Sequence, residues 1–162
     1  MYKVFCALGF VNLFEIVVKC VKKMVLKNEF VAGVILFGSV ARGEESERSD
    51  VDLLVLWEGL DVDAKKRHVY VYRIVSQYFP SSVKLTVLDM EYSSFLRVRK
   101  LTPLLLNIIY DGVVLYDKYG LLEKFLSKVR EELKAKGVKR VKLGKYYYWK
   151  LPKPGARVGL EV

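Results

Sequence analysis

Two aspartates and a Gly-Ser pair are the residues of this chain whose types and spacing best suit phosphate chemistry. Gly38 and Ser39 follow an apolar run, and ten residues separate them from Asp50, which is two residues before Asp52. A glycine after a strand lets the backbone approach a ligand, and the amide groups of a following helix point toward a bound anion. Ser39 adds a hydroxyl donor, and Arg42 adds a guanidinium for phosphate oxygens. The segment predicts a seat for the phosphates of a nucleotide.

The two aspartates are expected to lie on one face of a strand, because residues two apart on a strand project to the same side. Two carboxylates about 4 Å apart repel by about 1 kcal/mol in water and by about 4 kcal/mol at an intermediate effective dielectric. A divalent cation removes this repulsion, and Mg²⁺ commonly joins one or two carboxylates to nucleotide phosphates. Asp50 and Asp52 are therefore predicted to hold Mg²⁺ (or Mn²⁺). The alternative is that one aspartate caps a turn and the other faces solvent.

The pattern of apolar residues predicts strands that alternate with helices. Strands are expected at 31–37, 51–57, 83–88 and 113–117. Helices are expected at 10–27, 61–79, 103–112 and 120–136, and a hairpin or an extended segment is expected at 138–155. Alternation of this kind indicates an α/β (α+β) protein in which helices pack on a sheet.

The apolar stretch at 4–18 is too short to span a membrane. It has about fifteen residues where a spanning helix needs about twenty, and Glu15 interrupts it. It also lacks the small-residue cleavage site of a signal peptide. We therefore expect a buried helix in a cytoplasmic protein, with Cys6 and Cys20 as reduced core thiols. Few Asn and Gln together with many Lys and Glu indicate a thermophilic source.

The positive charge is concentrated toward the C-terminus. The chain has 28 Lys and Arg, 18 Asp and Glu and a net charge of +10; from Lys118 onward there are 13 basic and 4 acidic residues. This asymmetry indicates a polyanion or an acidic partner. The tail also interleaves aromatic residues with lysines, which suits contacts to RNA, although such residues can equally cover the sheet or an oligomer interface. The residues considered for these contacts are Lys139, Arg140, Lys142, Lys145, Tyr146, Tyr148 and Trp149.

The complete motif resembles the signature of the DNA polymerase β-like nucleotidyltransferase superfamily. The Gly-Ser pair, ten intervening residues and Asp-x-Asp match that signature, and Arg42, Gly43 and Ser49 match its minimal members in particular. The likeness covers roughly residues 10–135 and includes archaeal members. The resemblance implies a small mixed sheet flanked by helices. With the concentration of basic residues from Lys118 onward, we expect a nucleotidyltransferase core at 1–117 and, at 118–162, a basic C-terminal helix and aromatic-rich tail that packs on the core or extends from it.

The resemblance also implies roles for individual residues. Gly38 and Ser39 would seat the β- and γ-phosphates of a nucleoside triphosphate, and Arg42 would be a secondary phosphate contact. Asp50 and Asp52 would hold two Mg²⁺ ions that stabilise the attacking and leaving oxygens. A nucleotidyl group, in the first instance AMP, would pass to a hydroxyl acceptor.

Lys84 departs from the pattern of the superfamily, which usually places a third carboxylate on the adjacent strand. Lys84 and Thr86 are the polar members of one face of that strand. Lys84 can neutralise the aspartates in place of a metal, contact a phosphate, or extend to solvent. Asp89 falls on the opposite parity and would reach the site only through a bulge or a turn.

Two groups of charged residues are weaker candidates. His68 is the single histidine of the chain and stands in a charged helical stretch, so we expect a solvated surface residue. Glu44, Glu45 and Glu47 lie in a charged loop that could approach the nucleotide, but such loops are usually solvated.

Two functions of different classes are consistent with these residues. The first is a metal-dependent nucleotidyltransferase that acts on a protein, a small molecule or an RNA end. Minimal members of the superfamily that act as antitoxins and modify a HEPN-domain partner make a protein acceptor plausible. The second is a non-catalytic module that binds a nucleotide or a partner, which Lys84 favours. RNA contact through the tail and a homo-oligomer are compatible with both functions.

Overall fold

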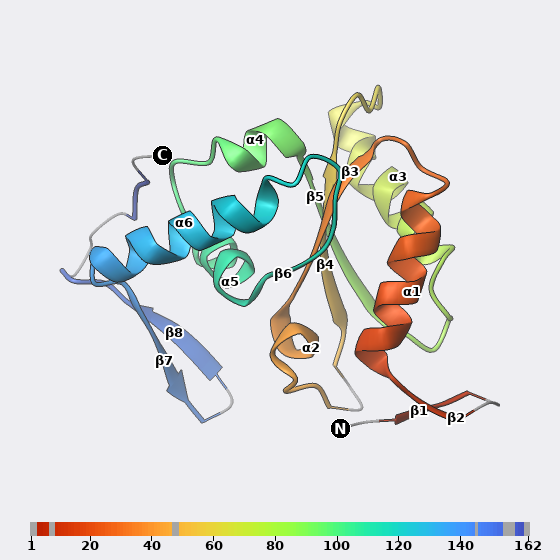
Figure 1. Ribbon diagram of the computed structural model, residues 1–162, viewed down its shortest axis with the longest axis horizontal. Coiled ribbons are helices and arrows are strands. Elements are labelled where there is room, and N and C mark those ends of the chain that lie inside the picture. Colours follow the sequence, from red (N-terminus) through yellow and green to blue (C-terminus); the bar gives the residue numbers. More distant parts are fainter. Residues whose placement is uncertain (1–2, 7–8, 47–48, 145, 154–157, 161–162) are drawn as a thin grey trace.

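A four-stranded mixed sheet lies at the centre of the protein (Figure 1). Its strands are β3 (Val31–Phe37), β4 (Val51–Trp57), β5 (Leu85–Glu91) and β6 (Val113–Asp117), in the spatial order β5-β4-β3-β6. β3 pairs antiparallel with both β4 and β6, whereas β4 and β5 run parallel. The computed structural model describes residues 3–6, 9–46, 49–144, 146–153 and 158–160.

Helices cover both faces of this sheet (Figure 1). One face carries α1 (Leu13–Val25) and α3 (Ala64–Ser76), and the other carries α5 (Pro103–Asp111) and α6 (Leu122–Ala135). The short helices that follow β3 and β5 are α2 (Gly38–Arg42) and α4 (Tyr92–Leu96). The expected small mixed sheet flanked by helices is confirmed.

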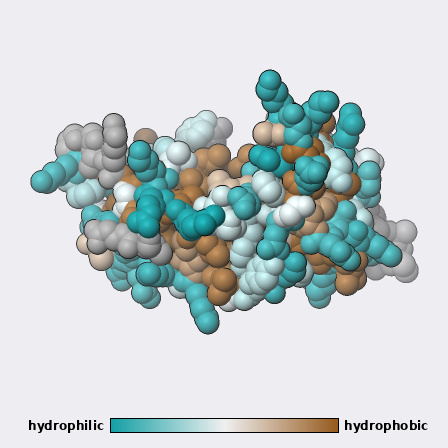
Figure 2. Space-filling model, turned by 90° about the horizontal axis from the view of Figure 1, so that it is seen from above, coloured by the Kyte–Doolittle hydropathy of each residue, from teal (hydrophilic) through white to brown (hydrophobic). Residues whose placement is uncertain are grey.

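Strand alternation divides the core into two layers. Leu53 and Val55 of β4 pack with α1 and α3, whereas Leu54 and Leu56 pack on the opposite side with α5 and α6. All four side chains are at most 2% exposed. Figure 2 shows one face of the molecule, seen from above, where hydrophilic side chains project around areas of hydrophobic ones. Side chains alternate between the two buried faces of β4, so the position of a polar residue in the strand, odd or even, decides on which face of the sheet it lies.

The N-terminal segment differs from the expected helix. Lys3–Cys6 (β1) and Gly9–Asn12 (β2) pair as an antiparallel hairpin, and α1 begins at Leu13. Aromatic and β-branched residues in this segment favour strands. The side chain of Asn12 accepts a hydrogen bond from the amide of Phe14 and thereby fixes the start of the helix.

The structure describes the side chain of Cys20 but not that of Cys6. Cys20 of α1 is buried and free, as expected, and burial raises the pKa of its thiol. The side chain of Cys6 lies outside the part of the chain that is described. Within the ranges given above, none of the helices combines the length and the apolar character that crossing a bilayer requires.

The tail forms the hairpin that was one of its two expected conformations. Its strands are β7 (Lys139–Leu143) and β8 (Tyr146–Lys150), joined at Gly144, which has a φ of 60°. The preceding helix α6 packs on the same core as β3 and β4, with Leu126 fully buried. The division of the chain into a core and an extension after Asp117 stays a prediction.

Leu126→Ala tests how α6 contributes to the core. Truncation of this buried side chain should lower the free energy of unfolding by about 2–5 kcal/mol. Leu121, just before α6, is 45% exposed, so Leu121→Ala is a matched control that should cost less than about 1 kcal/mol. Urea unfolding, monitored by circular dichroism, should show a single transition for Leu126→Ala, shifted to a lower urea concentration. A separate transition for α6 would contradict its packing on the shared core.

Candidate active site

The turn from β3 into α2 brings Gly38 against Asp52. The two strands pair so that Phe37 lies opposite Asp52, and Gly38 has a φ of 74°. A β-carbon built on Gly38 would collide with Oδ2 of Asp52 and would lie 3.0 Å from its Cγ. The positive φ and the lack of space both exclude a side chain at this position. The backbone of the turn therefore approaches an acidic group directly, with Ser39 half-buried as the next residue.

Asp50 and Asp52 share the strand parity of Leu54. Asp52 is half-buried, while Asp50, one residue before β4, is exposed. Burial raises the pKa of Asp52 above its ordinary value, and the charge of Asp50 raises it further. A hydrogen bond from the hydroxyl of Thr86 and the charge of Arg42 oppose this increase. The two carboxylates are thus close enough to repel each other, as the Asp-x-Asp spacing predicts.

This acidic pair fits a cation that is held jointly with a ligand. A divalent cation would remove the repulsion between Asp50 and Asp52, and carboxylate oxygens are ligands that Mg²⁺ and Mn²⁺ prefer. Among the described residues, no group of three or more His, Cys, Asp or Glu is arranged to hold a metal. Further ligands would therefore have to come from water and from the phosphates of a nucleotide.

Thr86 rather than Lys84 is the residue of β5 that faces Asp52. The strand begins at Leu85 instead of residue 83, so Lys84 stands exposed before it. Lys84 is not among the charged groups that shift the pKa of Asp52. In the parallel register Thr86 lies beside Asp52. The polar parity of this strand was predicted correctly, but Thr86 was not identified as a site residue.

Asp89 lies on the opposite face of the sheet from this site. Its register partner is Val55, and its side chain is 11% exposed. Its Oδ2 accepts hydrogen bonds from Nε1 of Trp57 at 3.1 Å and from Nε of Arg67 at 3.3 Å. His68 is an exposed residue, as expected, with Nδ1 3.6 Å from Oδ1 of Asp89. Asp89 therefore bonds to residues on the other face of the sheet and does not join Asp50 and Asp52.

Arg42 is held by two carboxylates. Its Nε lies 2.8 Å from Oε2 of Glu44, and one terminal nitrogen lies 2.7 Å from Oδ2 of Asp111. The guanidinium also lies 4.9 Å from the centre of the Tyr147 ring. Burial alone would lower the pKa of Arg42, but these hydrogen bonds and charges outweigh it and raise the pKa. A nucleotide phosphate would have to compete with Glu44 and Asp111 for this guanidinium.

The C-terminal hairpin completes this network. Nζ of Lys142 and the hydroxyl of Tyr147 both donate to Oε1 of Glu44, at 2.8 and 2.6 Å. Hydrogen bonds from Lys142, Tyr147 and Arg42 lower the pKa of Glu44 to about 2. Arg140 pairs with Oδ1 of Asp111 at 2.5 Å. Two residues considered for RNA contacts, Arg140 and Lys142, are therefore engaged within the chain.

The remaining tail residues are divided between the two faces of the hairpin. Trp149 lies on the half-buried inner face, on which Tyr147 also lies. Tyr146 and Tyr148 lie on the outer face and are 68% and 49% exposed. Lys139 is exposed, and Lys145 lies outside the described residues. Sequence reasoning missed Tyr147 and Asp111; the alternation within the tail would have placed Tyr147 with Trp149, but no sequence signal marks Asp111.

The two glutamates that the structure describes in the loop after α2, Glu44 and Glu45, have different surroundings. Oε2 of Glu45 is buried and accepts no hydrogen bond from the described residues. A carboxylate oxygen in such a position needs a donor or a cation. Glu44 is engaged by the hairpin rather than simply solvated. Glu47 lies outside the described residues.

The region that contains this site matches a known protein family. Residues 19–119, which include all four central strands, match the family described as "Polymerase beta, Nucleotidyltransferase". The chain belongs to this nucleotidyltransferase family. The family predicted from the Gly-Ser and Asp-x-Asp motif is confirmed.

Relatives of this nucleotidyltransferase cover most of its length. A candidate protein adenylyltransferase of Methanocaldococcus jannaschii is 27% identical over 138 residues, which are 85% of this chain and 90% of the relative. A crystal structure of a candidate nucleotidyltransferase from Sulfolobus solfataricus is 22% identical, covers 67% of this chain and 83% of its own, and has a TM-score of 0.45. A crystal structure of a toxin–antitoxin with AMP-PNP is 20% identical, covers 73% and 87%, and has a TM-score of 0.48.

Gly38→Ala should remove nucleotide binding, because the added methyl group collides with the carboxylate of Asp52. The backbone conformation adds about 1–2 kcal/mol of strain. Gly43→Ala is the matched control, since Gly43 has a φ of 66° and no atom lies within 4 Å of an added β-carbon. Calorimetric titration with ATP and Mg²⁺ should show binding for the control alone. Equal affinity in both variants would contradict the placement of the site.

Asp52→Asn should stabilise the protein at neutral pH without divalent cations. Because the folded pKa is raised, the ionised carboxylate disfavours folding above that pKa, and the cost vanishes where Asp52 is protonated in both states. The gain in Tm over wild type should be absent at about pH 3 and grow as the pH rises from about 4 toward 7. Thermal denaturation at several pH values measures it. A variant no more stable than wild type at any pH would show that the buried charge carries no penalty.

Proposed function

We propose that this nucleotidyltransferase moves AMP from ATP to a hydroxyl group of a protein, with Mg²⁺ or Mn²⁺ held by Asp50 and Asp52. The contact of the Gly38 turn with Asp52 carries the proposal, because it puts a close backbone approach and an acidic pair at one point. Family membership supports the transfer chemistry. The relative described as a candidate protein adenylyltransferase supports AMP and a protein acceptor.

The site residues divide the work of binding and transfer. The backbone of the Gly38 turn and the hydroxyl of Ser39 would bind the terminal phosphates. Asp50 and Asp52 would hold the cation, which when bound stabilises the charge on the attacking and leaving oxygens. The acceptor oxygen forms a bond to the α-phosphorus while the bond from that phosphorus to the bridging oxygen breaks. Pyrophosphate leaves with the bonding electrons, and the hydroxyl proton passes to water.

A HEPN-domain protein is the partner suggested by the resemblance to minimal nucleotidyltransferases that act as antitoxins. The proposal places the acceptor hydroxyl on that partner. RNA contact through the tail and a homo-oligomer stay predictions. Of the residues considered for RNA, Arg140 and Lys142 already pair with Asp111 and Glu44.

Incubation with ATP labelled on the α-phosphate tests the proposal. With Mg²⁺ or Mn²⁺ and a HEPN-domain protein as the candidate acceptor, label should appear on that protein. Asp50→Asn and Asp52→Asn should each reduce the transfer by at least about 10²-fold, because each removes a ligand of the cation that stabilises the transition state. Glu58→Gln, at an exposed carboxylate that bonds Lys118 and Tyr119, is the control and should transfer normally. Transfer that survives both aspartate variants would overturn the assigned roles.

A nucleotide-binding module without catalysis is the second candidate function. Thr86 favours it, because a hydroxyl rather than a third carboxylate faces Asp52. ATP binding that requires Asp52, together with no transfer to any acceptor, would support this function. In that case Thr86→Asp, which adds a carboxylate beside Asp52, is the variant in which transfer should be sought.

A further inference from the structure

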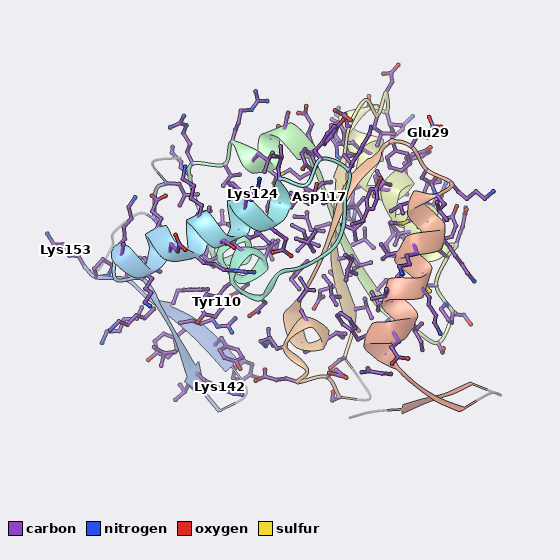
Figure 3. The ribbon with its side chains drawn as sticks, in the orientation of Figure 1. Glu29, Tyr110, Asp117, Lys124, Lys142 and Lys153 are labelled. Atoms are coloured by element: carbon purple, nitrogen blue, oxygen red, sulfur yellow. The ribbon has the colours of Figure 1, made fainter. Side chains whose placement is uncertain are left out.

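A cavity lies between α5, α6 and the C-terminal hairpin, apart from the Gly38 turn. Its volume is about 630 Å³, which is within the range of small-molecule sites. Apolar residues of α6 and the segment after it form part of its wall. The residues that could recognise a ligand there are Tyr110, Arg130, Lys134, Lys139, Arg140 and Trp149. Figure 3 shows Tyr110 between α5 and the hairpin.

The charged residues that line this cavity are all basic. Lys134 and Lys139 are exposed at its edge. Arg130 donates from Nε to the carbonyl of Ile109 at 2.8 Å and from a terminal nitrogen to the carbonyl of Gly112 at 2.7 Å. Carbonyl groups fix the guanidinium but do not neutralise its charge. The cavity therefore favours an anionic ligand.

Arg140 adds positive charge that a single carboxylate only partly balances. Its side chain is 9% exposed and pairs with Asp111, which is 3% exposed. The other oxygen of Asp111 already pairs with Arg42. Arg42 also pairs with Glu44, which Lys142 contacts as well. Three basic groups thus share two carboxylates, and the network between Arg42 and the cavity keeps a net positive charge.

Aromatic side chains form another wall of the cavity. The rings of Tyr110 and Trp149 meet edge to face, with centroids 5.4 Å apart and an angle of 78° between planes. Nε1 of Trp149 donates to Oδ1 of Asn107 at 2.9 Å, and the Arg140 guanidinium lies 4.3 Å from the Tyr110 ring centre. These contacts hold the rings in place, and fixed aromatic surfaces bind planar rings at little cost in side-chain entropy.

We propose that this cavity binds a phosphorylated nucleoside, either as a free nucleotide or as the terminal nucleotide of an RNA. The phosphate lies among the basic side chains, and the base contacts Tyr110 and Trp149. The site is separate from the triphosphate seat at Gly38 and does not depend on the proposed transfer reaction. Both sources of the ligand share the chemistry of an aromatic ring next to a phosphate.

The fluorescence of Trp149 reports binding at this cavity. The chain has two Trp, so Trp57→Phe leaves Trp149 as the single tryptophan, which is excited selectively at the red edge of the absorption band. Without divalent cations, AMP and a 5′-phosphorylated RNA oligonucleotide are titrated separately, with adenosine as the ligand that lacks phosphate. AMP should quench the emission if free nucleotides suffice, and RNA alone should quench it if an RNA end is required. Quenching by neither, or equally by adenosine, would overturn the proposal.

Charge reversal at the edge of the cavity tests the phosphate contact. The double variant Lys134→Glu, Lys139→Glu should weaken binding of the quenching ligand at least about tenfold, as expected for the loss of one charged hydrogen bond. The double variant Lys124→Glu, Lys128→Glu changes two exposed lysines of α6 that do not line the cavity. It should change the affinity less than about twofold. Equal losses in both double variants would show non-specific attraction and overturn the site.

Two further measurements separate this cavity from the triphosphate seat. Trp149→Phe, with Trp57 retained, should abolish the quenching and confirm that the signal comes from the cavity. The Lys134→Glu, Lys139→Glu variant should still bind ATP with Mg²⁺ at wild-type affinity, measured by calorimetry. If Gly38→Ala removes AMP quenching together with ATP binding, a single nucleotide spans both regions and the second site is wrong.

Discussion

The pairing of β3 with β4 controls the contact on which the rest of the site depends. This pairing places Phe37 opposite Asp52, so the turn at Gly38 must pass directly over the Asp52 carboxylate. A slip of one residue would send Asp52 to the face that packs against α1 and α3, because side chains alternate along a strand. Burial of both faces of β4 prevents such a slip, since it would put a charge into an apolar layer. The core thus holds the acidic pair in place.

The buried carboxylate of Asp111 connects the phosphate turn to the C-terminal hairpin. It pairs with Arg42 from α2 and with Arg140 from β7, and Glu44 adds a second connection through Lys142. These residues come from segments far apart in the chain. The hairpin is therefore part of the surroundings of the candidate active site, although it lies outside the region that matches the nucleotidyltransferase family. The same arrangement leaves Arg140 between the turn and the second cavity.

Local patterns predicted the central elements well, and they failed where pairing between segments decided the outcome. Strands at 31–37 and 51–57 were predicted at their observed bounds, because apolar runs bounded by turn residues have few alternatives. The N-terminal segment was predicted as a helix but forms β1 and β2. Its apolar residues fit the periodicity of a helix as well as that of a strand, and pairing of the two strands with each other favours the hairpin. The third strand begins two residues later than predicted, which moved Lys84 out of the sheet.

The sequence by itself determined the family, the acidic pair and the glycine turn, because these residues are close in the chain and their spacing follows strand geometry. Tertiary structure decided which groups surround them. Thr86 faces Asp52 through the register of parallel strands, and Arg42 is held by Asp111, which is 69 residues away. Distances between groups that meet through sheet register and helix packing are not encoded in local periodicity. These distances are fixed only when the helices pack on both faces of the sheet and form the two apolar layers.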